Sequence, residues 1–133
     1  MKKKQTKKSA VHSLNHGIFF GTTVLLYNMT FGEIMLELNE GWRLGLEEDK
    51  DLIETGGNML LKRVSTKQSY YYLILKEFNF TDHDMAVLAH ELIHLCQFLL
   101  PEHNVELEKE TECVAYFHTY MMNQVLTFLR SIK

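Results

Sequence analysis

The single proline of the chain, Pro101, separates two long stretches in which apolar side chains recur at intervals of three and four residues. This periodicity predicts one amphipathic helix over residues 82–99 and another over residues 105–130. Thr81 is the expected N-cap of the first helix, with Asp84 three residues later. The helix is expected to end before Pro101, because the residue preceding a proline disfavours helical geometry. Two long helices joined by a short turn therefore dominate the second half of the chain.

Runs of β-branched and aromatic side chains in the first half of the chain predict strands. Residues 16–27 favour one strand, and residues 58–64 and 69–77 favour two more that flank a polar turn as a β-hairpin. Strands that precede two long helices predict an α+β fold, with a small antiparallel or mixed sheet followed by two long antiparallel helices. Residues 1–15 are expected to be a flexible basic tail before a single domain over residues 16–133.

One shorter helix is expected between the strands. Thr30 and Glu33 have the spacing of a capping box, in which each side chain accepts a hydrogen bond from the other residue's backbone N–H. Apolar residues follow at helical intervals, which predicts a helix over residues 31–40. Residues 41–57 are polar and are expected to be irregular.

Charge is unevenly distributed along the chain. Five lysines lie in the first eight residues, and the remainder carries 9 basic against 17 acidic side chains, a net charge of −8. A basic tail can bind nucleic acid or can simply be solvated. The acidic body argues against a nucleic-acid-binding surface on the domain, so nucleic acid is disfavoured as a partner.

The composition favours a soluble protein of the cytoplasm. No run reaches the roughly 18 apolar residues that a membrane span needs. No small-residue cleavage site follows the apolar stretch at residues 18–29, which argues against a secretory signal. Cys96 and Cys113 are the only cysteines and form no CxxC pair, so no disulfide framework is expected, and both are interpreted as small buried residues.

The strongest chemical signal is the segment His90-Glu91-Leu92-Ile93-His94. On a helix, residues four apart lie one turn above each other, so both imidazoles face the same way and can bind a single zinc ion. Glu91 is offset by about 100° and lies beside such a metal, where its carboxylate can take a proton from water. This pattern is typical of metallopeptidases, and one Zn²⁺ per chain is the expected cofactor.

A catalytic zinc site usually has a third protein ligand, and helical rise points to Glu112. If the second helix begins near Val105 and returns antiparallel, Glu112 comes back to the level of His94 after about 10 Å. Glu108 returns only about 4.5 Å and His118 overshoots to about 19 Å. The alternative is that the glutamates at 106, 108, 110 and 112 form one solvated acidic face.

Taken together, the two motifs resemble the gluzincin class of zincin metallopeptidases. Glu112-Cys113-Val114-Ala115-Tyr116 begins 18 residues after His94, and small phage-type members have a Glu-x-x-Ala-Tyr segment in this place. The chain is also similar to proteases that cleave phage-type repressors, although Tyr116 stands where those have Asn or Asp. The metzincin pattern is excluded, since Gln97 and Leu100 replace its Gly and His. The likeness covers about residues 70–120.

This resemblance implies a zincin-like fold in which zinc is bound by His90, His94 and Glu112. It also implies that Glu91 is the general base and that a peptide or protein is the substrate. In zincins the strand before the zinc helix forms an edge of the cleft and pairs with an extended substrate, and residues 69–77 are the expected strand. The alternative is that the tyrosines of this strand only pack within the hairpin.

Transition-state stabilisation is not assigned by the sequence. His118, Tyr116 and Tyr120 are candidates for the group that would stabilise an oxyanion, but each also suits a core or surface position. Gln97 could orient a ligand or could be an ordinary helix glutamine. Two alternative functions stay open: a non-catalytic zinc-stabilised module that binds a protein, and a regulatory protease that cleaves a repressor.

Overall fold

A four-stranded mixed sheet forms the centre of the computed structural model, which describes residues 8–41, 46–65 and 68–132. The strands are β1 (Ala10–Asn15), β2 (Thr22–Tyr27), β3 (Met59–Ser65) and β4 (Gln68–Leu75). Their order is β1-β2-β4-β3, with β2 parallel to β4 and the other two pairs antiparallel. The predicted hairpin of β3 and β4 is confirmed, and β1 and β3 are the edges of the sheet.

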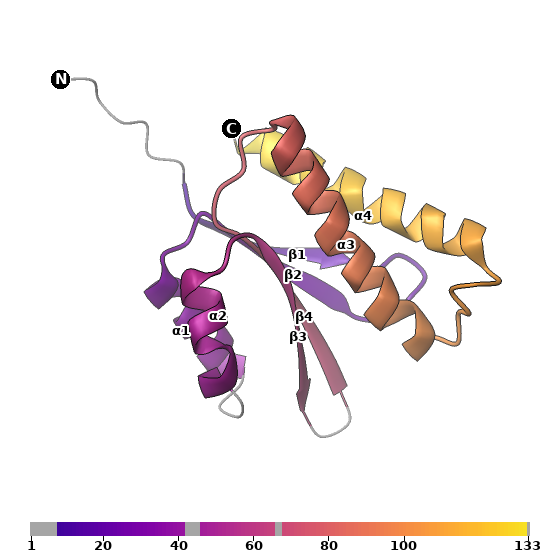
Figure 1. Cartoon of the computed structure of the whole chain (residues 1–133), viewed down its shortest axis with the longest axis horizontal. Helices are drawn as coiled ribbons and strands as arrows, with labels where there is room; N and C mark the ends of the chain where they lie inside the picture. Colours follow the sequence, from indigo (N-terminus) through magenta and orange to yellow (C-terminus); the bar gives the residue numbers. More distant parts are fainter. Residues whose placement is uncertain (1–7, 42–45, 66–67, 133) are drawn as a thin grey trace.

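Helices cover both faces of this sheet (Figure 1). They are α1 (Phe31–Gly41), α2 (Leu46–Thr55), α3 (Asp82–Glu102) and α4 (Thr111–Ser131). Successive residues of a strand point to opposite faces, so Leu26 and Ile74 pack with α1 and α2, while Leu25 and Leu73 pack with α3 and α4. The chain is therefore an α+β protein with two long helices, as predicted.

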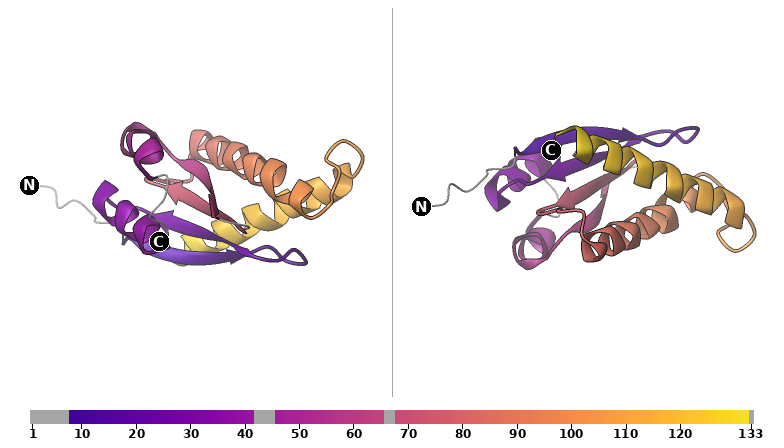
Figure 2. Two further views of the ribbon diagram at one scale, coloured as in Figure 1. Left: turned by 90° about the horizontal axis from the view of Figure 1, so that it is seen from below. Right: turned by 90° about the horizontal axis from the view of Figure 1, so that it is seen from above.

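The two long helices divide one face of the sheet between them. Figure 2 shows α4 along β1 and β2, and α3 along β3 and β4, with α4 running back in the opposite general direction to α3. A row of leucines on α3, made up of Leu88, Leu92, Leu95 and Leu99, is buried against the sheet and α4. This row leaves the opposite side of α3 exposed.

The predicted starts of α1 and α3 are confirmed in detail. The backbone N–H of Thr30 donates to the Glu33 carboxylate and that of Glu33 donates to the Thr30 hydroxyl, which completes the capping box of α1. The Thr81 side chain accepts from the backbone N–H of Asp84 and so caps α3. These contacts are local, which is why the sequence identifies them.

Two regions of the first half differ from prediction. Residues 10–15, expected in the tail, form β1, and the single strand predicted over residues 16–27 is the loop after β1 followed by β2. β1 is an edge strand whose inward side chains include Leu14, while its other face is exposed, so its hydrophobic signal is weak. The irregular region predicted at residues 41–57 contains α2, a polar helix that buries Ile53. Residues 1–7, which include four of the tail lysines, lie outside the described residues.

The turn between the long helices also differs from prediction. α3 continues through Pro101 and ends in a Schellman motif, with Asn104 in the left-handed region at φ 63°. The N–H of Val105 donates to the carbonyl of Leu100, and that of Asn104 donates to the carbonyl of Pro101. Val105 is the buried apolar residue of this motif and therefore belongs to the C-terminal end of α3. α4 begins six residues later.

Among the helices that the structure describes, none combines the length and the apolar character that crossing a bilayer requires.

Candidate metal centre

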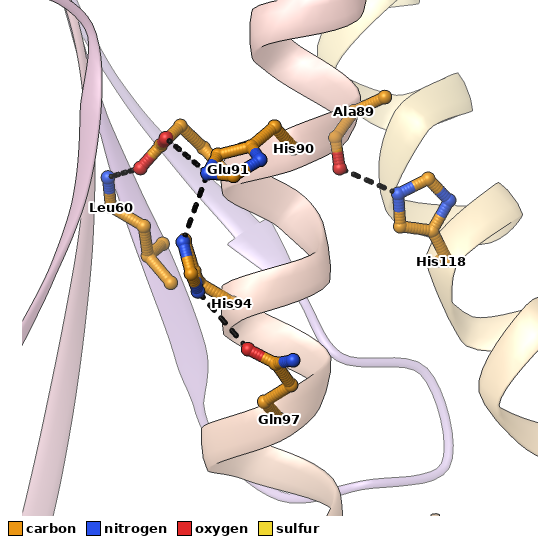
Figure 3. A network of polar contacts seen from close by, with 7 residues as sticks. All are labelled: Leu60, Ala89, His90, Glu91, His94, Gln97 and His118. Atoms are coloured by element: carbon orange, nitrogen blue, oxygen red, sulfur yellow. Dashed lines mark hydrogen bonds and ion pairs between the residues drawn. The ribbon is translucent and has the colours of Figure 1, made fainter.

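His90 and His94 lie one turn apart on the exposed side of α3. Their rings are roughly perpendicular, with centroids 4.7 Å apart, and the two Nε2 atoms approach to 3.1 Å (Figure 3). The side chain of His90 is 66% exposed, so a solvated cation can reach this pair directly. The buried leucines on the opposite side of α3 fix the helix rotation that holds both rings outward.

The spacing of the two nitrogens fits a single metal ion. Zinc binds histidine nitrogen at about 2.0–2.1 Å with tetrahedral angles, which places two such nitrogens about 3.3–3.4 Å apart. The observed separation of 3.1 Å is close to this value. Two imidazole nitrogens on one helix face, this close together, also suit the ligand preference of zinc. The residues present therefore fit the ion that the sequence predicts.

Glu91 links the histidine pair to the sheet. Its Oε1 accepts a 2.8 Å hydrogen bond from the backbone N–H of Leu60 in β3, and its Oε2 lies 3.8 Å from Nε2 of His90 (Figure 3). The side chain is only 15% exposed, so the carboxylate is held between α3 and β3. One oxygen is thus anchored to the sheet, and the other lies beside the histidine pair.

His94 has a second polar partner on its own helix. Its Nδ1 lies 3.0 Å from Oε1 of Gln97, one turn further along α3. Gln97 is exposed and projects from the same side of the helix as the histidines (Figure 3). The two nitrogens of the His94 ring therefore have distinct partners, namely His90 and Gln97.

The structure brings three of the four predicted site residues together. Among the residues that the structure describes, His90, Glu91 and His94 form a group whose potential ligand atoms lie within 4.8 Å of one another. Glu112 does not belong to this group and is exposed in the first turn of α4. The expectation that the helix begins at Val105, on which the rise calculation for Glu112 rested, is wrong.

The first turn of α4, which carries Glu112, lies beside Ile93, the sequence neighbour of His94. The residues one before and three after Glu112, Thr111 and Ala115, line a hollow of about 350 Å³ together with Ile93. The loop over residues 103–110 therefore brings the chain back beside Ile93 of α3 before α4 begins. A third ligand at Glu112 remains a prediction.

The three candidates for oxyanion stabilisation have other positions. Nε2 of His118 donates a 3.0 Å hydrogen bond to the carbonyl of Ala89, and Figure 3 places its ring on the α4 side of α3, away from the histidine pair. The hydroxyl of Tyr120 donates to the side chain of Asn15 in β1. Tyr116 is 77% exposed. None of the three is brought to the pair in this arrangement.

The strand beside the centre is β3, not the predicted strand over residues 69–77. That strand is β4, which is interior because it pairs with both β2 and β3. The prediction failed because it took the last strand before the helix to be the edge, whereas the parallel pairing with β2 places β4 inside the sheet. Among the strands that the structure describes, β3 pairs with β4 alone, and the N–H of Leu60 donates from its other edge to Glu91.

Further along α3 a second set of polar contacts joins the helix to β3 and β4. The carboxylate of Glu102 accepts hydrogen bonds from the hydroxyls of Tyr71 and Ser69, and lies 3.7 Å from the amine of Lys62. Partial burial by itself raises the pKa of Glu102, but these contacts outweigh it, so the pKa lies below its usual range. Glu102 therefore stays ionised and fixes the C-terminal end of α3 against the sheet.

Neither cysteine belongs to the centre. Cys96 is buried on the core side of α3, where burial raises the pKa of its thiol to about 11. Cys113 is half-buried on α4, next to Glu112 in the sequence. A thiol held protonated in the core is a poor metal ligand, which agrees with the structural role expected of Cys96.

Comparisons with protein-family models, curated proteins and solved structures give no match to this chain. The assignment of a function therefore rests on the site itself. One participant that sequence reasoning missed is Leu60, because its contribution is a backbone N–H whose position depends on how β3 packs against α3. No pattern in the sequence signals that contact.

Proposed function

We propose that this chain binds one zinc ion through His90 and His94 and hydrolyses peptide bonds with Glu91 as the general base. The observation that carries the proposal is the convergence of the two Nε2 atoms at 3.1 Å with the Glu91 carboxylate beside them. A zinc site that is only structural does not require a carboxylate next to the metal. The pattern is also that of the zincin metallopeptidases, so a zincin-like fold forms part of the proposal.

The residues of the chain have separate roles in this chemistry. When bound, zinc would polarise the scissile carbonyl and lower the pKa of a water molecule toward about 7. Oε2 of Glu91 takes a proton from that water and later returns it to the nitrogen of the leaving amine. The bond from Leu60 to Oε1 keeps the carboxylate oriented for both transfers. The two histidines hold the metal and do not exchange protons with the substrate.

Glu112 is proposed as the third ligand. Its support is the position of the first turn of α4, which shares a hollow with Ile93 beside His94, together with the gluzincin-like spacing. A carboxylate at this point would leave a fourth position for water, as catalytic zinc sites require. A change in the side-chain conformation of Glu112 is part of this proposal, since the carboxylate lies outside the group formed by the histidines.

The outer edge of β3, which pairs with no other described strand, suits an extended peptide. A peptide that adds to this edge gains affinity from backbone hydrogen bonds, which tolerate many sequences. Lys62 is two residues from Leu60, so its backbone groups point to the same side of the strand as the Leu60 N–H that donates to Glu91. The edge runs directly beside Glu91, which would place the backbone of a bound peptide near the reacting groups.

A non-catalytic zinc module is the second candidate, and one observation favours it. The hydrogen bond between Glu91 and Leu60 ties α3 to the sheet, so Glu91 also has a structural role that needs no turnover. Both candidates bind zinc, and only the first cleaves peptides. The deciding experiment measures the zinc content of the purified protein and then screens the zinc-loaded protein against a peptide library. No bound zinc would overturn both candidates, and bound zinc without cleavage would leave the second.

A further inference from the structure

The ring of His94 is held at both nitrogens by side chains of the same helix. Nε2 faces Nε2 of His90 at 3.1 Å, and Nδ1 faces Oε1 of Gln97 at 3.0 Å. The three side chains follow one exposed stripe of α3, at intervals of four and three residues (Figure 3). Neighbours at these intervals touch on a helix surface, so the contact follows from the helix alone.

The partner at Nδ1 determines where the proton of the ring lies. An amide oxygen only accepts hydrogen bonds, so Nδ1 of His94 must carry the hydrogen and donate it to Gln97. A neutral imidazole has one N–H, and the lone pair is then on Nε2. Nε2 is the nitrogen that converges with His90 on the candidate metal position. Gln97 therefore selects the tautomer that can bind a metal through Nε2.

We propose that Gln97 is a positioning residue that fixes the tautomer and ring orientation of His94 for zinc binding. This inference rests on the proposed zinc site and adds to it a residue outside the ligand set. Metal-binding histidines commonly donate their second ring N–H to an acceptor, which orients the ring and raises its basicity. Gln97 supplies that acceptor in this chain.

The exposure of Gln97 makes the proposal straightforward to test. Gln97 lies on the solvent side of α3, opposite the leucines that anchor the helix. Replacing it removes no core contact, so Gln97→Ala is expected to fold with the stability of the unaltered protein when no metal is present. Gln97→Glu keeps an acceptor at the same distance, and Asn123→Ala removes an exposed amide from α4 as a matched control.

The first measurement needs no metal. Long-range ¹H–¹⁵N NMR spectra of the metal-free protein report which nitrogen of His94 is protonated. We expect the Nδ1–H tautomer in the unaltered protein, in Gln97→Glu and in Asn123→Ala, and a mixture with the Nε2–H tautomer in Gln97→Ala. An unchanged tautomer in Gln97→Ala would overturn the proposal.

The second measurement is the Kd for zinc, obtained by competition with a chelating dye. Outer-shell partners typically change metal affinity by about 10–100-fold, so Gln97→Ala should bind zinc about 10–100-fold more weakly, while Gln97→Glu and Asn123→Ala should retain affinity. If all four proteins bind zinc equally, Gln97 has no positioning role although the zinc site stands. If the unaltered protein binds no zinc, the proposed function itself fails, and the positioning role fails with it.

Discussion

The backbone N–H of Leu60 donates a 2.8 Å hydrogen bond to Oε1 of Glu91, which joins the edge strand β3 to α3 across 31 residues of sequence. The other oxygen of this carboxylate, Oε2, lies 3.8 Å from Nε2 of His90. The same carboxylate is therefore both a tie between two elements and the proposed base. Substitutions at Glu91 can separate these two roles.

Glu91→Gln should abolish peptide cleavage and retain zinc. The glutamine side chain keeps an oxygen that can accept from Leu60 but cannot take a proton from water, so the rate of cleavage should fall by at least about 10²–10⁴-fold. Zinc content by elemental analysis and cleavage of a reporter peptide are the two measurements. The thermal midpoint should change little, because the tie to β3 is kept.

Glu91→Ala is the matched variant for the structural role. It removes the acceptor for Leu60 as well as the base, so its free energy of unfolding should fall by about 1–3 kcal/mol. The Glu91→Gln variant keeps the acceptor, so its free energy of unfolding should be close to that of the unaltered protein. Cleavage that persists in Glu91→Gln would show that another group is the base.

Removing either histidine should remove zinc-dependent stabilisation. In the unaltered protein, free zinc at 100 times its Kd should raise the free energy of unfolding by about 2.7 kcal/mol. His90→Ala and His94→Ala should lose this increase, because each deletes one of the two converging nitrogens. Chemical denaturation with and without zinc measures the effect.

His83→Ala provides the control for this experiment. It alters an exposed histidine of the same helix that lies outside the histidine pair, so its zinc response should match that of the unaltered protein. A zinc response that persists in His90→Ala and His94→Ala would point to zinc binding elsewhere on the chain, and a response lost in His83→Ala would show that the loss is not specific to the pair.

The sequence predicts the centre well where the contacts are local. His90 and His94 converge because residues four apart share a helix face, and Thr81 caps α3 through a residue three positions away. The contact of Leu60 with Glu91 could not be predicted in this way, because it depends on β3 lying at an edge of the sheet. That position follows from the parallel pairing of β2 with β4, which joins distant segments.

The turn between the long helices shows a second limit of prediction from the sequence. Spacing from Pro101 suggested that α4 begins at Val105, but burial of Val105 and the left-handed conformation of Asn104 end α3 instead. The energy of burying one valine against the core is a tertiary effect that overrides the local pattern. The position of Glu112 relative to His94 therefore depends on how the loop returns rather than on helical rise.

Glu112→Gln tests the third ligand. A neutral amide is a far poorer zinc ligand than a carboxylate, so zinc affinity should fall more than about 100-fold, a larger loss than outer-shell substitutions cause. Glu108→Gln is the matched control, because it neutralises another exposed glutamate four residues earlier. Dye competition gives the Kd of each variant. Equal affinities in the two variants would remove Glu112 from the ligand set and leave the two histidines with water.

The stability of the fold should depend on pH through His16. This side chain is 2% exposed, its Nδ1 donates to the carbonyl of Phe20, and its Nε2 accepts from the hydroxyl of Thr23. Burial lowers the pKa of His16, and the nearby His103 lowers it further, while the Phe20 carbonyl acts in the opposite direction. The folded protein therefore favours neutral His16.

The sign of the pH effect follows from this shift. The unfolded chain binds a proton at His16 near pH 6.5, whereas the folded chain does so only at lower pH, so stability is fully present above about pH 6.5 and declines as the pH falls toward the folded pKa. Urea denaturation of metal-free protein at pH 7.5, 6.5 and 5.5 should show this decline. His16→Gln can donate to Phe20 and accept from Thr23 without titrating, so its stability should decline less steeply as the pH falls. His83→Gln alters an exposed histidine, so its stability should decline as steeply as that of the unaltered protein. An equal decline in all three proteins would mean that other groups cause the pH dependence.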